Sequence, residues 1–179
     1  MSGQPSDNTR TATISVLVDN EAGTLARVIG LFTGRGYNID SLTVAPVEAD
    51  GALSRINVVT SGTSMVITQI KAQLDRLVQV HRVSDLTEEG PHIAREMALV
   101  KVVGIGEQRV EALRIAESFR ARVVDTTTGS FVFEITGASD KLDAFIDLMR
   151  DLGLAEVSRT GIAALARGAR TISTLHSEH

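Results

Sequence analysis

The sequence contains no cysteine, which excludes a disulfide framework, a thiol nucleophile and any cysteine-based metal site. Tryptophan is also absent, and one tyrosine with five phenylalanines predicts an aliphatic core and disfavours recognition of bases by stacking. Basic residues number 18 against 22 acidic ones, so the formal charge of −4 leaves no broad positive field for nucleic acid. No apolar run approaches the ~18 residues of a membrane span, and the polar start MSGQPSDNTR lacks a signal-peptide core. We therefore expect a cytoplasmic protein that binds neither nucleic acid nor membrane.

The first half of the chain carries apolar residues in a spacing that predicts the element order βαββαβ. The Asp50-Gly51 pair is a hairpin signal between two of the strands. Strands are expected at residues 12–18, 39–47, 53–59 and 78–86, and helices at 24–35 and 64–77.

The second half repeats this plan about 85 residues later, after a break rich in Glu, Gly and Pro at residues 87–92. The repeat consists of strands at 97–103, 122–127, 130–136 and 155–158, and helices at 107–119 and around 142–149. We therefore predict one domain at residues 11–86, a linker at 87–96, a second domain at 97–168, and a flexible tail at 169–179.

A βαββαβ unit forms a four-stranded antiparallel sheet with both helices on one face, so the predicted fold class is α+β with two ferredoxin-like domains. This arrangement leaves the other sheet face and the sheet edges open. Because open edges invite strand pairing with another copy, we expect a homodimer.

The turn before the first helix has the composition of a small-ligand site. Gly23 lets a ligand approach the backbone, and the helix start offers free N–H groups that suit a carboxylate. Asn20 supplies a donor and an acceptor, while Asp19 and Glu21 favour an ammonium group. An α-amino acid carries both of these charged groups and therefore fits the turn. The alternative is an ordinary turn in which Thr24 caps the helix.

A second informative turn follows this helix. Gly36 is expected to end the helix in the left-handed conformation, and Asn38 then begins the next strand with its side chain near the sheet edge. A simple helix stop is again the alternative. The two turns are expected at the same end of neighbouring elements, which together strengthens the binding hypothesis.

Catalytic interpretations are weaker. The four histidines, at positions 81, 92, 176 and 179, form no zinc motif. Gly104 and Gly106 follow a strand, but Arg109 stands where a dinucleotide fingerprint needs its third glycine.

The chain resembles the small, regulatory subunit of acetolactate synthase, also called acetohydroxyacid synthase, in which the first domain is an ACT domain. A lone NEAGTL would indicate only an ACT domain, whereas the ordered series is specific to this family. The series consists of NEAGTLARVIGLF (20–32), RGYNIDSLTVAP (35–46), LSRINVV (53–59), LVQVHRVSDL (77–86), REMALVKV (95–102), KLDAF (141–145) and RTGIAALARG (159–168).

The resemblance implies a non-catalytic subunit that activates a large catalytic subunit and confers feedback inhibition by valine in branched-chain amino acid biosynthesis. It implies thiamine diphosphate, Mg and FAD on that catalytic subunit, and none on this chain. The effector would lie between ACT domains, and the choice among valine, leucine and isoleucine stays open. The implied contact positions are Asn20, Glu21, Ala22, Gly23, Thr24, Leu25, Tyr37, Asn38 and Ile39.

Three other functions occur on folds of this kind or use the same binding chemistry. An acylphosphatase on this fold needs a positive cradle after the first strand, where Asp19 and Glu21 stand instead. An RNA-binding βαββαβ module needs aromatic residues on its strands, and residues 12–18 and 53–59 have none. A free-standing amino-acid sensor that controls another enzyme is the nearest rival.

Overall fold

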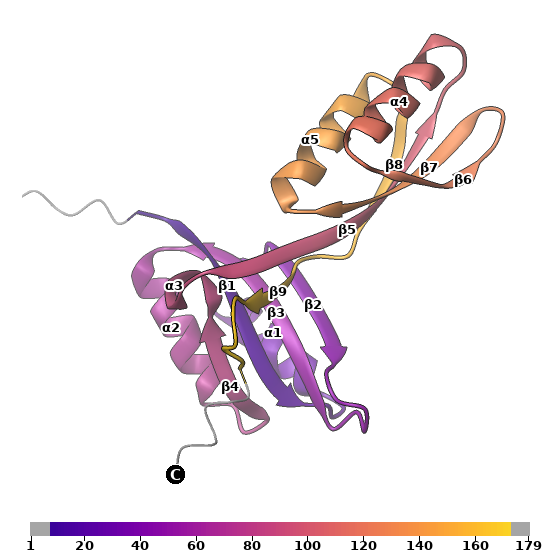
Figure 1. Ribbon diagram of the computed structural model, residues 1–179. Helices are drawn as coiled ribbons and strands as arrows, with labels where there is room; N and C mark the ends of the chain where they lie inside the picture. The colour runs from indigo at the N-terminus through magenta and orange to yellow at the C-terminus, as the bar shows by residue number, and fades with distance from the viewer. Residues whose placement is uncertain (1–7, 173–179) are drawn as a thin grey trace, which may run out of the picture. The chain divides into compact units, whose positions relative to one another are not determined.

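The computed structural model describes residues 8–172, which form two compact units (Figure 1). Unit 1 takes the chain up to Ile93 together with the described residues from Ile162 onward, and unit 2 takes Ala94–Gly161. No helix within residues 8–172 is long and apolar enough to cross a lipid bilayer.

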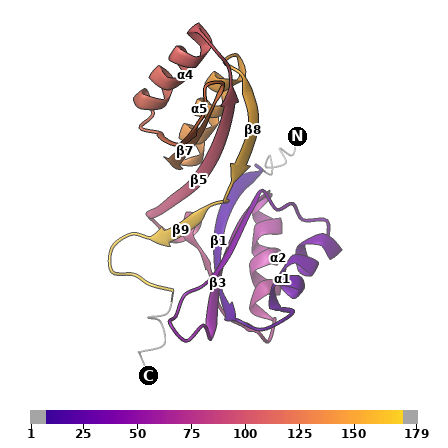
Figure 2. The same ribbon diagram turned by 90° about the vertical axis from the view of Figure 1, so that its right-hand side faces the viewer.

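Unit 1 has the predicted βαββαβ order, with a four-stranded antiparallel sheet in the strand order β2-β3-β1-β4. Both long helices lie on one side of this sheet (Figure 2). The elements are β1 (Arg10–Asp19), α1 (Thr24–Gly34), β2 (Ser41–Pro46), β3 (Leu53–Gly62), α2 (Ser64–Asp75) and β4 (Val80–Asp85).

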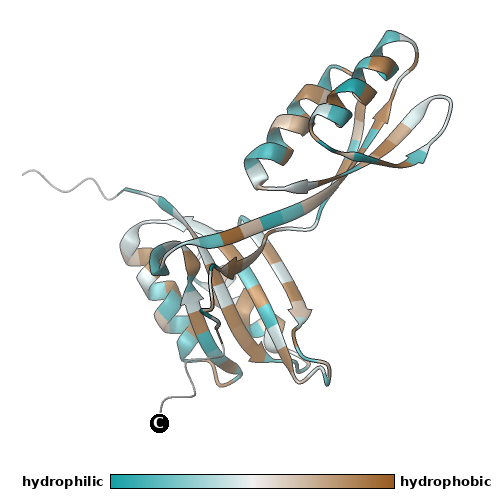
Figure 3. Ribbon diagram, in the orientation of Figure 1, coloured by the Kyte–Doolittle hydropathy of each residue, from teal (hydrophilic) through white to brown (hydrophobic). Residues whose placement is uncertain are grey.

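The alternation of residue types along the strands of unit 1 determines which face meets the helices (Figure 3). Ile14 and Val16 on β1 are fully buried against α1 and α2, and so is Phe32 on α1. Apart from Phe32 and the flanking Tyr37, whose rings meet edge to face at 6.3 Å, this core is aliphatic as predicted.

Unit 2 repeats the architecture, with the strand order β6-β7-β5-β8 and α4 and α5 packed on its sheet. Its core is more aromatic than predicted, because four of the five phenylalanines gather here; Phe133 and Phe145 are fully buried, edge to face at 6.0 Å. The elements are β5 (His92–Val103), α4 (Glu107–Ser118), β6 (Arg122–Thr126), β7 (Ser130–Gly137), α5 (Ser139–Arg150) and β8 (Leu154–Arg159).

The segment predicted as a linker, residues 87–96, is largely structured. A short helix, α3 (Leu86–Glu89), follows β4 directly because the buried carboxylate of Asp85 accepts hydrogen bonds from the backbone N–H groups of Thr87 and Glu88. From His92 onward the chain is already strand β5.

The open sheet face predicted for unit 1 is instead covered by the end of the chain. Strand β9 (Ala163–Ala166) lies on the side of the sheet opposite α1 and α2 (Figure 2). The backbone N–H of Ile162 donates to Ser41 Oγ at 2.8 Å, and Arg55 Nη1 donates to the Ala164 carbonyl at 3.2 Å. Residues from Ile162 to 168, which the sequence analysis assigned to the second domain, therefore pack on unit 1.

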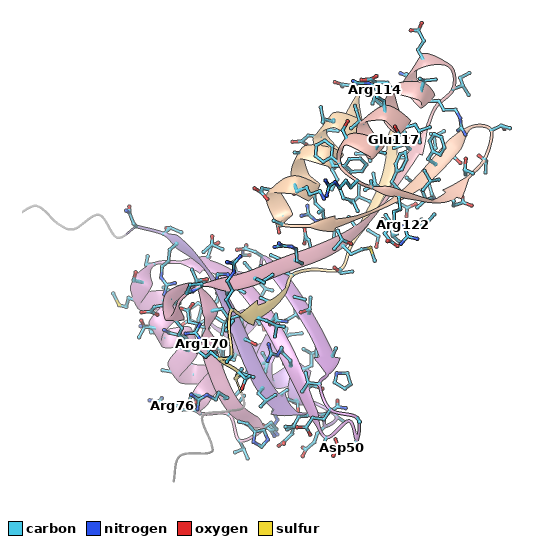
Figure 4. All side chains as sticks on the ribbon, viewed as in Figure 1. Asp50, Arg76, Arg114, Glu117, Arg122 and Arg170 are labelled. Carbon is cyan, nitrogen blue, oxygen red and sulfur yellow. The ribbon has the colours of Figure 1, made fainter. Side chains whose placement is uncertain are left out.

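The predicted tail begins within this covering segment. Arg170 follows β9 and its Nη1 donates to the Glu89 carbonyl beside α3 (Figure 4). Residues 169–172 thus contact unit 1, whereas 173–179 lie outside the described residues.

Candidate functional site

The turn between β1 and α1 is fastened to the hairpin between β2 and β3. Asn20 Nδ2 donates to the Gly51 carbonyl at 2.7 Å, and the Asn20 backbone N–H donates to the Ala52 carbonyl at 2.9 Å. The hairpin turns at Gly51, whose φ of 69° is left-handed, as the Asp-Gly signal predicts. Asn20 therefore has a structural role in holding the turn, and Glu21 and Ala22 beside it are exposed.

Helix α1 begins without a side-chain cap. Gly23 is the N-cap residue in the left-handed conformation, with φ 86°, and a Cβ there would meet nothing within 4 Å. The alternative in which Thr24 caps the helix is wrong, since Thr24 is already helical and its hydroxyl is buried without a hydrogen-bond partner among the described residues. Leu25 packs partly against the core and anchors this end. The open helix start suits a small anion.

The turn after α1 is built as predicted at Gly36, which is left-handed with φ 69°. Tyr37 donates its hydroxyl to Gln69 Oε1 at 3.3 Å, and Ile39 packs against the core. The exposed Asn38 donates its side-chain N–H to the carboxylate of Asp40. This interaction points the Asn38 amide along the start of β2.

The two turns do not meet within one chain, which corrects the expectation that they lie at the same end of neighbouring elements. They lie at opposite ends of α1, whose 11 residues span about 16 Å. The pairing register agrees, because Asp19 pairs with Leu53 at one end of β3, whereas Ser41 pairs with Val59 near the other. Within a single copy the two turns are therefore separate.

The described residues contain no candidate metal centre. Among residues 8–172, no group of three or more His, Asp or Glu side chains is placed to hold a metal ion. His81 Nε2 lies 2.5 Å from Asp19 Oδ1 and His92 begins β5, while His176 and His179 fall outside the described residues.

The structure also shows a cavity of about 670 Å³ in unit 1 that the sequence analysis missed. It lies on the sheet face away from α1 and α2, under the segment from β9 to Ile172. Arg55 and Arg82 line it. A sequence signal existed, since both arginines occupy strand positions on the face that the helices leave uncovered, but charged residues at such positions are normally solvated.

Comparison with known proteins decides the family. Residues 14–82 match the sequence model described as an AHAS small subunit-like ACT domain, and residues 95–168 match the one described as the small subunit of acetolactate synthase. The chain is also 48% identical over 156 residues to the acetolactate synthase isozyme 3 small subunit of Salmonella typhimurium, an alignment that covers 87% of this chain and 94% of that one. The chain belongs to the acetolactate synthase small-subunit family.

Further acetolactate synthase small subunits agree with this assignment. The probable small subunit of Archaeoglobus fulgidus is 47% identical over 156 residues, covering 87% of this chain and 96% of its own. The crystal structure of the small subunit from Thermotoga maritima superposes with a TM-score of 0.80 at 38% identity, covering 90% of this chain and 99% of that one. The predicted fold of two ferredoxin-like units is confirmed, and unit 1 is the ACT domain.

Proposed function

We propose that this chain binds the catalytic subunit of acetolactate synthase in the cytoplasm, raises its activity and makes it sensitive to feedback inhibition by valine. Thiamine diphosphate, Mg and FAD would belong to the catalytic subunit, and this chain would supply no catalytic group. Family membership supports the partnership. The uncapped start of α1 beside a left-handed Gly23 is the observation that carries the effector site.

The effector site is proposed to form between two copies of the ACT domain. Strand β2 is a sheet edge, and α1 connects β1 to β2, so this helix lies on the β2 half of the sheet. Two copies paired through β2 about a two-fold axis would set their α1 helices antiparallel. The turn at residues 20–25 of one copy would then face the turn at residues 37–39 of the other.

Such a site can recognise both ends of an amino acid. The N–H groups and positive dipole end of α1 attract the carboxylate, and the buried hydroxyl of Thr24 has no hydrogen-bond partner among the described residues. Glu21 and Asp19 lie beside this helix start and favour the ammonium group. A ligand shared by two copies binds one arrangement of the dimer better than another, and such coupling is typically worth about 1–3 kcal/mol.

The test is to assay purified catalytic subunit with and without this chain, across a valine titration. We expect higher turnover with the chain present, and progressive loss of that turnover as valine is added. Unchanged turnover would reject the subunit role and would favour the alternative of a free-standing amino-acid sensor. If the chain raises turnover but added valine does not lower it, valine is rejected as the effector.

A variant of the first turn separates the effector site from the contact with the catalytic subunit. Asn20→Ala removes the hydrogen bond to Gly51 and should weaken valine inhibition more than activation. Asn8→Ala, the same change at an exposed position before β1, is the matched control and should leave both effects as they are. Equal loss of both effects in Asn20→Ala would assign the turn to the fold or to the subunit contact.

A further inference from the structure

The cavity of unit 1 is built on a regular pattern of residues across three strands. On β1, Leu17 pairs with Arg55 of β3 on one side and with Arg82 of β4 on the other. Because adjacent strands lie about 4.8 Å apart, the two arginine backbones are about 10 Å apart on the same sheet face. Two residues earlier on β1, Ser15 lines the same cavity.

The end of the chain forms the roof of this cavity. Arg55 Nη1 holds the Ala164 carbonyl at 3.2 Å, and Thr43 Oγ1 donates to the Ile162 carbonyl at 3.1 Å. Arg170 then fastens the segment to the carbonyl of Glu89. The cavity is partly open to solvent, and its volume of about 670 Å³ falls within the range of roughly 300–1,000 Å³ typical of small-molecule sites.

The charges that line the cavity are unbalanced toward the positive. Three arginines, Arg55, Arg82 and Arg170, oppose two glutamates, Glu48 and Glu89, so the lining carries one net positive charge. Among residues 8–172, no ion pair joins any of these three arginines to a carboxylate. Partial burial also lowers the pKa of Arg55 from its ordinary value, because it removes part of the water around the guanidinium.

A buried hydroxyl in the same cavity lacks a partner. Ser15 is 1% exposed, and no described residue forms a hydrogen bond with its Oγ. Buried polar groups are almost always paired, so the unpaired hydroxyl of Ser15 keeps hydrogen-bonding capacity for a ligand in this cavity. Ser15 lies two residues before Leu17, which pairs with both arginines, and the apolar side chains of Leu17, Leu53 and Leu86 also line the cavity.

We propose that this cavity binds a small aliphatic monocarboxylate. Its carboxylate would lie between Arg55 and Arg82 and accept a hydrogen bond from Ser15, and its apolar tail would pack on Leu17 and Leu53. One net positive charge matches a monoanion better than a phosphate dianion, and the leucines give a tail something to contact. The site is separate from both turns at the ends of α1, so it stands or falls independently of the valine site.

The test uses the full chain, labelled with ¹⁵N, and follows backbone amide shifts of β1, β4 and β9 during titration with 3-methylbutanoate. Two ligands with the same tail, 3-methylbutan-1-amine and 3-methylbutan-1-ol, control for the charge, and inorganic phosphate controls for the tail. We expect saturable shifts around Ser15 and Arg82 with the carboxylate alone. Absence of saturable shifts up to tens of millimolar would overturn the proposal.

Two variants make the test specific. Arg82→Gln should weaken binding of 3-methylbutanoate at least tenfold, whereas Arg76→Gln, on the C-terminal end of α2 and outside the cavity lining, should leave it within twofold. Ser15→Ala removes only the hydroxyl and should weaken binding about threefold or more, which keeps the test valid if Arg82→Gln fails to fold. Equal binding of phosphate, of the alcohol or of valine at these amides would also overturn the proposal, as would equal effects of Arg82→Gln and Arg76→Gln.

Discussion

A carboxylate introduced at the start of α1 should strongly weaken recognition of an anion there. Gly23→Asp is the most direct perturbation, because the open space around Gly23 accommodates a side chain and no cap would be displaced. The new side chain would carry its negative charge to within about 5 Å of a ligand carboxylate bound at the helix N–H groups. At an effective dielectric constant of about 20, that repulsion amounts to about 3 kcal/mol, or about a hundredfold in affinity.

The positive φ of Gly23 adds a separate effect on folding. A residue with a Cβ in the left-handed region loses roughly 1–2 kcal/mol, and aspartate tolerates the region better than most residues. Thermal melting of the variant therefore has to accompany the binding measurement. A melting temperature only a few degrees below that of the unmodified chain would leave the charge effect interpretable.

Gly30→Asp is the matched control on the same helix. Its seven-residue separation from Gly23 corresponds to about 10 Å along the axis, which is about one Debye length at 0.1 M salt. We expect the half-inhibitory valine concentration to rise about a hundredfold in Gly23→Asp and less than about threefold in Gly30→Asp, and calorimetry should show the same ranking. An unchanged half-inhibitory concentration in a folded Gly23→Asp variant would refute the placement of an anion at this helix start.

Two further predictions concern the fold of each unit. Gly153→Ala should destabilise unit 2 by about 3 kcal/mol or more, because Gly153 has a φ of 99° and an added Cβ would overlap the Val103 carbonyl. Gly129→Ala is the control, since its Cβ would meet nothing within 4 Å, and its melting temperature should stay near that of the unmodified chain. Equal melting temperatures of the two variants would contradict this prediction. Lys71→Met should raise the pKa of Glu88, which the hydrogen bond from Lys71 Nζ at 2.7 Å holds below its ordinary value. A carboxyl group whose pKa is lower in the folded state stabilises that state above its unfolded pKa, and this stabilisation is lost as the pH falls through its folded pKa. The unmodified chain and Lys71→Met should therefore converge in free energy of unfolding at acid pH. An unchanged carboxyl ¹³C titration of Glu88 would disprove the pairing.

Much of the fold follows from local patterns that survive in the three-dimensional structure. The apolar residues Ile14, Val16 and Val18 and the helical spacing of Val28 and Phe32 predict elements that bury those side chains. Gly36 also ends α1 in the left-handed conformation, as its position predicts. These features depend on residues only a few positions away in the sequence, so they can be predicted from a single sequence.

The features that were missed depend on contacts far apart along the chain. Strand β9 has only four residues, and it is held through distant groups such as Ser41 and Arg55. No local hydrophobic periodicity predicts such a strand. The placement of Arg55 and Arg82 in a cavity could not be predicted for the same reason, because only the returning segment at residues 162–172 turns an exposed sheet face into the wall of a cavity.

Both turns of the candidate effector site were predicted from the sequence, whereas their separation was not. The glycines of both turns are visible in the sequence, but the distance between the turns depends on the length of the helix that joins them. Eleven residues of α1 keep Gly23 and Gly36 at opposite ends, so composition alone identified the two turns and misjudged the distance between them.

The return of residues 162–172 to the ACT domain has a consequence for how the chain is made. Unit 2 lies wholly between two portions of unit 1 in the sequence, so during synthesis all of its residues emerge before unit 1 possesses its last strand. Domains usually fold in the order in which the ribosome delivers them. Here the first domain to begin is the last to be finished, and a nascent chain halted near Gly161 would carry a whole second domain and an ACT sheet with one bare side.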